Sequence, residues 1–111
     1  PYSDAMLNLM HARQTMYKDW TNIINKKHKG ISKRLKKDSG YEGFTNDQAV
    51  RVFLWKQAGY DIPGLDFKDI FNLQNKVRLD KDLRNFANDV SILSKQANGY
   101  VEKLTGVQVV S

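Results

Sequence analysis

Proline is confined to Pro1 and Pro63 in this chain of 111 residues. Because proline is the residue that most strongly disrupts a helix interior, almost the whole chain is free to be helical. Apolar side chains recur at spacings of three and four residues in several separate stretches, which is typical of amphipathic helices. The sequence therefore predicts an all-α fold: one domain over residues 1–111, a compact bundle of about four main helices with one or two short ones.

The first main helix should begin near Ala5, where Ser3 or Asp4 can cap it. It should continue into a lysine-rich stretch, where Gly30 can terminate it. Its apolar stripe consists of Met6, Met10, Tyr17, Trp20 and Ile24. A short helix is expected next, over residues 31–37.

Residues 45–48 (TNDQ) form a capping box, which predicts the start of the second main helix, and Gly59 suits its end. That helix is apolar on nearly all sides, so we expect it to lie centrally. The core candidates of the short helix and this one are Ile31, Leu35, Phe53 and Trp55.

Pro63 and Gly64 suit the centre of a type II turn, with Ile62 and Leu65 as apolar anchors that insert into the core on either side. The next helix should start after Asp66 as its cap and fade near Val77. Its inward residues are expected to be Phe67, Ile70 and Phe71.

The last main helix should follow a cap at Asp80 and stop at Asn98 and Gly99, with one further turn over residues 100–104. The stripe of this helix is Leu83, Phe86, Ala87, Val90, Leu93 and Ala97. Residues 105–111 are expected to be a tail, in which only residues 107–110 favour a strand.

The positive charge of the chain is concentrated in one place. The net charge is +6, and residues 26–37 contain no acidic residue, while the rest of the chain is nearly neutral. Such a stretch can contact phosphates, dock on an acidic protein or simply face solvent. The candidate nucleic-acid-binding residues are Lys26, Lys27, Lys29, Lys33, Arg34, Lys36 and Lys37.

Catalysis has little support in the sequence. There is no cysteine, which excludes disulfides, zinc–thiolate sites and cysteine nucleophiles. His11 and His28 lie too far apart for a ligand pair; we expect His28 at the surface and His11 as a polar residue on a helix face. We therefore predict no catalytic residue, no metal site and no cofactor.

Two further motifs have a structural explanation. Asp61, Asp66 and Asp69 lie close together in sequence and could form a cluster of carboxylates. However, Asp66 suits the cap of the next helix, and Asp69 suits its first turn. Residues 40–43 match a GxxG loop, which we interpret as a turn because no strands accompany it. No apolar run approaches the ~18 residues that span a bilayer, so no membrane insertion is expected.

Residues 45–55 (TNDQAVRVFLW) and 59–65 (GYDIPGL) resemble a helical segment of the very large polyvalent proteins of bacteriophages and mobile elements. In those proteins a helix ending in Leu-Trp precedes a Gly…Ile-Pro-Gly turn and two further helices. The stripe over residues 83–93 is similar to the last of these, and residues 9–16 match the preceding helix. The resemblance covers most of residues 5–97, and the lysine-rich stretch is its main departure.

The resemblance implies a non-enzymatic module of a giant phage protein, packaged in the virion or delivered from it into the host cytoplasm. Its partners would be other phage proteins or further parts of a larger polypeptide, with DNA or RNA contacted through charge. A chain that begins at Pro1 fits a processed piece as well as a chosen boundary. The alternative is an independent small basic protein that binds nucleic acid or inhibits a nucleic-acid enzyme.

Overall fold

The computed structural model describes residues 3–105, with side chains for all of these except Met6 and residues 97–105. Within this range the only strand-like feature is an isolated bridge between Asp38 and Thr45. The helices are α1 (Asp4–Ile24), the 3-10 helix η1 (Asn25–Lys27), α2 (Ile31–Leu35), α3 (Asn46–Gln57), α4 (Phe67–Leu79) and α5 (Lys81–Thr105). The prediction of an all-α fold with four main helices and short additional ones is confirmed.

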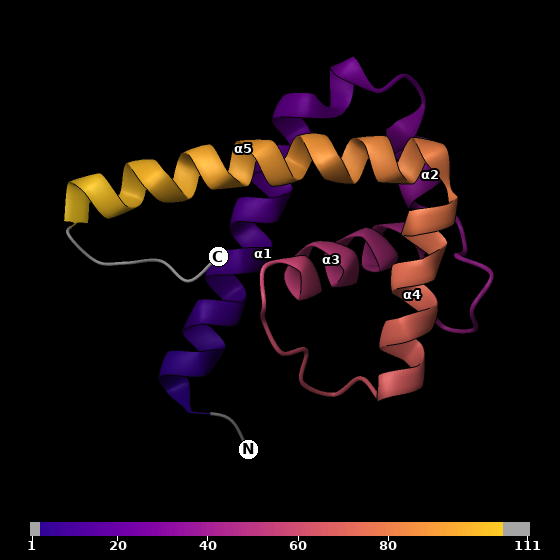
Figure 1. Cartoon of the computed structure of the whole chain (residues 1–111), viewed down its shortest axis with the longest axis horizontal. Coiled ribbons are helices and arrows are strands. Elements are labelled where there is room, and N and C mark those ends of the chain that lie inside the picture. The colour runs from indigo at the N-terminus through magenta and orange to yellow at the C-terminus, as the bar shows by residue number, and fades with distance from the viewer. Residues whose placement is uncertain (1–2, 106–111) are drawn as a thin grey trace.

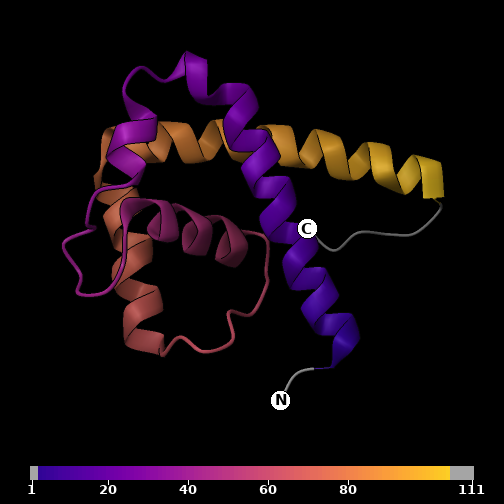
Figure 2. The ribbon, with the colours of Figure 1, turned by 180° about the vertical axis from the view of Figure 1, so that it is seen from behind.

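The longest helix, α5, organises the arrangement of the others. It packs against α1, α3 and α4, and α3 packs in addition against α4. Figure 1 shows α1 crossing α5, while α3 and α4 lie to one side of that crossing. The view from behind in Figure 2 shows the N-terminal half of α1 continuing past the crossing, away from α5.

The core is one cluster of buried side chains to which every α-helix contributes. In the centre lie Leu73 and Val77 of α4 and Leu83 and Phe86 of α5, all fully buried. The predicted inner residues of α2, Ile31 and Leu35, also belong to the cluster. The other buried members are Tyr17, Ala49, Val50, Val52, Ala87 and Val90.

The helix ends follow the local signals in the sequence. Thr45 and Gln48 form the expected capping box: the Gln48 amide donates to Thr45 Oγ1 (3.2 Å), and the Thr45 amide donates to Gln48 Oε1 (2.8 Å). Asp66 caps α4 by accepting from the Asp69 amide at 2.8 Å. At the end of α3, Gly59 takes a positive φ of 85°, a backbone conformation that favours glycine.

The expected orientation of α4 is only partly correct. Ile70 packs against the core, but Phe67 is 85% exposed and Phe71 is 53% exposed. The helix instead buries Leu73 and Val77, which continue the face of Ile70 at spacings of three and four residues. Packing against α3 and α5 selects that face, and the two phenylalanines are left towards solvent.

Two predicted helix boundaries are wrong. The first main helix ends at Ile24, and Gly30, with a φ of 75°, precedes α2 instead of terminating α1. The last helix does not stop at Asn98 and Gly99 but continues to Thr105. A glycine inside a helix costs only about 1 kcal/mol relative to alanine, so it does not by itself end one. Residues 107–110, expected to favour a strand, lie outside the described residues.

The two predicted core residues of α3 differ in their surroundings. Phe53 is half-buried and packs against the core cluster. Trp55 is also half-buried, but it lines a surface cleft beside α1 and α5. The expectation of a buried Trp55 is therefore wrong, because no helix in the described part of the chain closes over its side of α3. Ile62 and Leu65, the anchors of the turn, pack against the core but remain half-buried, so their expected insertion is only partial.

Candidate nucleic-acid interface

The basic stretch connects α1 to the rest of the fold: η1 lies at the upper edge of the molecule in Figure 1, and α2 lies lower, beside the start of α5. Burial of Ile31 and Leu35 on the inner side of α2 holds this stretch against the core. Lys33 lies midway between these two residues in sequence, so it emerges on the opposite, outer side of the helix.

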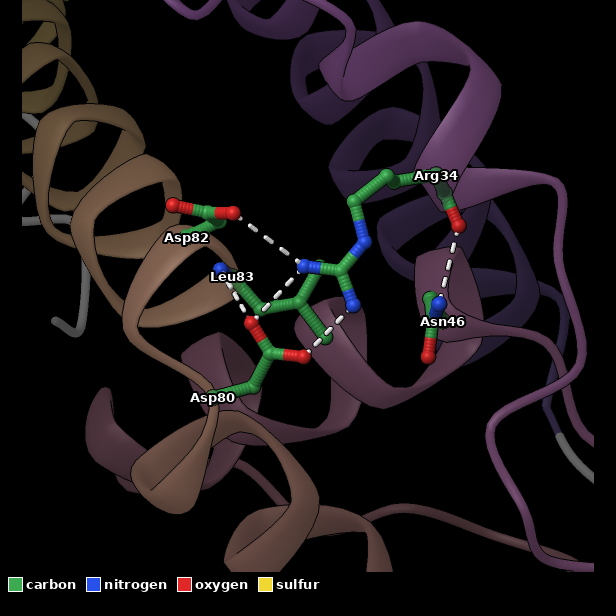
Figure 3. Close-up of polar contacts among 5 residues, drawn as sticks. All are labelled: Arg34, Asn46, Asp80, Asp82 and Leu83. Atoms are coloured by element: carbon green, nitrogen blue, oxygen red, sulfur yellow. Dashed lines mark hydrogen bonds and ion pairs between the residues drawn. The ribbon is translucent and has the colours of Figure 1, made fainter.

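Arg34 is one of two basic residues of the stretch whose charged group contacts a carboxylate of the fold, and Lys27 is the other. Arg34 donates to both carboxylate oxygens of Asp80, at 2.9 and 2.6 Å, and approaches Asp82 at 3.5 Å (Figure 3). The hydrogen bond between them raises the pKa of Arg34 and lowers the pKa of Asp80. Asp80 also caps α5 by accepting from the Leu83 amide at 3.2 Å. Arg34 therefore ties α2 to the start of α5.

The backbone beside Arg34 is held as firmly as its side chain. The buried Asn46 donates from Nδ2 to the Arg34 carbonyl at 2.9 Å, as Figure 3 shows. The backbone N–H of Asn46 donates to the Lys37 carbonyl at 2.8 Å. These two bonds connect the basic stretch to the first turn of α3, so the lysines project from a fixed backbone.

The expectation that His28 lies at the surface is wrong. Its side chain is 16% exposed, and its Nε2 lies 2.6 Å from the Asp89 carboxylate of α5. The ring also meets Phe86 edge-on, with centroids 5.5 Å apart. Lys27 reaches the same carboxylate at 3.3 Å. The hydrogen bond from His28 and the contact with Lys27 lower the pKa of Asp89.

The remaining cations of the stretch face solvent. Within the described part of the chain they make no ion pair with a carboxylate. They are Lys26, Lys29, Lys33, Lys36 and Lys37. Exposed, unpaired ammonium groups on an ordered backbone are what non-specific contact with nucleic-acid phosphates requires.

A small recess lies at one end of the basic surface. It has a volume of about 250 Å³, and its polar lining combines Lys27, Lys29 and Arg34 with one carboxylate, Asp82. The carboxylate partly offsets the positive charge inside the recess. The lysines outside it, on α2 and the following turn, therefore form the more positive part of the surface.

The other sequence motifs take structural roles. Asp66 caps α4, and Asp69 lies in its first turn, as expected. Residues 40–43 belong to a turn closed by a hydrogen bond from the Ser39 amide to the Phe44 carbonyl at 2.9 Å. His11 is exposed on α1. The described residues contain no group of three His, Asp or Glu side chains arranged to hold a metal ion.

Sequence reasoning missed the acidic partners of the basic stretch, Asp80 and Asp89. Each lies more than forty positions from its cation along the chain, at separations of 46 and 61 residues. The only local signal was the position of Asp80 as a helix cap, which does not reveal a second role.

In the described range, no helix combines the length and the apolar character needed to cross a membrane. Comparison of the chain with known protein families, with curated proteins and with solved structures finds no match.

Proposed function

We propose that the chain is a non-enzymatic helical module of a large bacteriophage protein, packaged in the virion or delivered from it into the host cytoplasm. In this role it packs against other protein and contacts DNA or RNA through charge. The similarity of residues 45–55 and 59–65 to helical segments of polyvalent phage proteins supports the module. The exposed lysines of residues 26–37 support the contact with nucleic acid.

One observation carries the nucleic-acid part of the proposal: the basic stretch divides into cations that hold the fold and cations that do not. Arg34 and Lys27 contact carboxylates of the domain itself. Lys33, Lys36 and Lys37 remain exposed beside them, without a carboxylate partner in the described range. The fold therefore accounts for two of the cations and leaves the exposed lysines available to an external anion.

The binding should depend on charge and not on base sequence. We would measure fluorescence anisotropy of two labelled duplexes of unrelated sequence between about 50 and 200 mM salt, the range over which phosphate contacts weaken steeply. The test variant replaces Lys33, Lys36 and Lys37 with glutamine and keeps Arg34. The control variant makes the same change at three exposed lysines elsewhere, Lys18, Lys68 and Lys81.

We expect similar affinities for the two duplexes in the native chain. In the test variant the log–log salt slope should decrease by roughly 0.9 for each phosphate contact removed. The control variant should keep most of the slope. No binding of either duplex at about 50 mM salt, or equal losses in both variants, would contradict the proposal.

An independent small basic protein that binds nucleic acid or inhibits a nucleic-acid enzyme would use the same lysines. The genomic reading frame separates this alternative from the phage module. A frame that continues in both directions with further domains favours the module, while a frame limited to this domain favours the independent protein.

A further inference from the structure

The apolar face of α1 is covered along only part of its length. Tyr17 is buried, and Trp20 and Ile24 pack against the core. Towards the N-terminus the same helix exposes Leu9 by 50% and Met16 by 37%. At helical spacing Leu9 and Met16 lie on the side of α1 that also carries Trp20, so the face continues beyond the core.

This uncovered face forms one wall of a cleft with a volume of about 420 Å³. The second wall is the C-terminal end of α3 with the residues that follow it, and α5 closes the end. Both tryptophans of the chain, Trp20 and Trp55, line it. The principal apolar lining residues are Leu9, Met16, Tyr17, Trp20, Leu54 and Trp55.

The charge in the cleft has one sign. Its lining includes Arg13 and Lys95, and no Asp or Glu is among the described residues that line it. The Arg13 guanidinium lies over the Tyr60 ring, 3.6 Å from the centroid. Its Nε is buried and has no hydrogen-bond acceptor within the described part of the structure. A carboxylate that enters the cleft would pair with the positive charge of this guanidinium.

We propose that the cleft is a docking site for an amphipathic helix of a partner protein with acidic residues beside its apolar face. Leu9 to Trp20 extends about 16 Å along α1, which matches about three turns of a helix. Apolar anchors would insert between the two tryptophans, and a carboxylate would meet Arg13 or Lys95.

The positive charge of the cleft, as well as its shape, favours an acidic partner helix over a second copy of the chain. A second copy of the chain that presented the same cleft would bring Arg13 and Lys95 towards like charges, which disfavours a symmetric dimer through this surface. The inference deepens the protein-packing part of the proposed function and uses none of the lysines assigned to nucleic acid.

The experiment uses the whole chain and a pair of synthetic 15-residue helical peptides with the same leucine face. One peptide carries glutamate on the flanks of that face, and the other carries lysine at the same positions. Binding is followed by the two indole NMR signals, because both tryptophans line the cleft. We expect the glutamate peptide to shift both signals and to bind at least tenfold more tightly than the lysine peptide.

Two matched substitutions locate the site on α1. Leu9→Gln should weaken binding of the glutamate peptide at least fivefold, because Leu9 lines the cleft. Leu7→Gln is the control: Leu7 is 47% exposed on the same helix but does not line the cleft. It should change the affinity less than twofold.

The charge is tested separately. Arg13→Gln should reduce the preference for glutamate over lysine at least threefold. Lys95→Gln, at an exposed position, should act in the same direction without disturbing the stacking on Tyr60.

The proposal is overturned if the glutamate peptide does not bind with a Kd of about 1 mM or tighter, or if the lysine peptide binds equally well. Indole shifts that depend on protein concentration without peptide would identify a second copy as the occupant and would also overturn it. The variant with Lys33, Lys36 and Lys37 replaced by glutamine should bind the glutamate peptide like the native chain, because none of these lysines lines the cleft. Peptide binding and nucleic-acid binding therefore test the cleft and the lysine surface separately.

Discussion

The guanidinium of Arg34 and the carboxylate of Asp80 form a bidentate salt bridge, with nitrogen–oxygen distances of 2.9 and 2.6 Å. The pair joins α2 to the residue that caps α5. One carboxylate oxygen thus accepts from both the guanidinium and the Leu83 amide. Planar pairs of this kind combine strength with a fixed geometry, so the junction orients the basic stretch relative to the longest helix.

Arg34→Gln should lower the free energy of unfolding by about 1–2 kcal/mol, measured by urea denaturation. The change removes a charge-assisted pair and leaves Asp80 without its cation. Partial exposure of Arg34, 35% of its side chain, screens the pair and keeps the loss below that of a fully buried one. The control is Lys33→Gln on the same helix, which should change stability by less than about 0.5 kcal/mol. Equal losses in the two variants would show that the pair does not stabilise the fold.

Acid should destabilise the domain through Asp80 and Asp89. Hydrogen bonds from Arg34 and His28 lower the pKa values of these carboxyls, so the folded state binds their protons less readily than the unfolded chain. Stability from this source is present above the ordinary aspartate pKa of about 4 and is lost as the pH falls through the lower folded values. The free energy of unfolding should therefore fall from about pH 5 downwards.

The Asp80→Asn variant tests this assignment. It should be less stable than the native chain at neutral pH, and its stability should fall less steeply in acid, because one of the two carboxylates is gone. Asp61→Asn, at an exposed loop position, should keep the native pH dependence. An unchanged acid slope in Asp80→Asn would exclude this carboxylate as a source of the pH dependence.

Tyr17 links α1 to α3 through a hydrogen bond from its hydroxyl to Asp47 Oδ1 at 2.8 Å. Burial raises the pKa of Tyr17, so the hydroxyl remains a donor in the folded state. Tyr17→Phe should lower the free energy of unfolding by about 1 kcal/mol, the usual contribution of one hydrogen bond. Asp47 keeps Arg51 as a partner, with a nitrogen–oxygen distance of 2.8 Å, which limits the loss.

Tyr17→Ala separates the packing of the ring from its hydroxyl. Removal of a large buried side chain costs about 3–5 kcal/mol, so thermal and urea denaturation should rank this variant well below Tyr17→Phe. Similar stabilities for the two variants would mean that the ring adds little to the packing of α1. That result would conflict with its exposure of only 3%.

The features predicted correctly from the sequence are those that depend on near neighbours. Thr45, Asp66 and Asp80 cap their helices because each side chain accepts from an amide three positions along the chain. Ile31 and Leu35 face inward because a single helical turn places them on one side. The four residues Leu83, Phe86, Ala87 and Val90 form the buried face of α5 for the same reason.

The errors concern features that distant segments determine. Either side of α4 offers apolar residues, and packing against α3 and α5 selects Leu73 and Val77 over Phe67 and Phe71. His28 is half-buried because α5 brings Asp89 to it from a position 61 residues away. No periodicity within the basic stretch contains that information. At the candidate interface, the sequence located the basic residues but could not show which of them the fold would occupy.

Trp55 and Phe86 provide the comparison that separates the cleft from the core. Phe86 is fully buried in the central cluster, so Phe86→Ala should lower the free energy of unfolding by about 3–5 kcal/mol. Trp55 is half-buried and lines the cleft, so fewer of its contacts are lost on truncation. Trp55→Ala should therefore cost about 1–2 kcal/mol, in proportion to the smaller area that it removes from water.

The two variants should also differ in binding. Trp55→Ala should remain folded by circular dichroism and should lose most of its affinity for the glutamate peptide, because a wall of the cleft is missing. A destabilisation of Trp55→Ala as large as that of Phe86→Ala would show that the indole belongs to the core in solution. The cleft would then be closed in the free protein, and the apolar end of α1 would have to find its partner elsewhere.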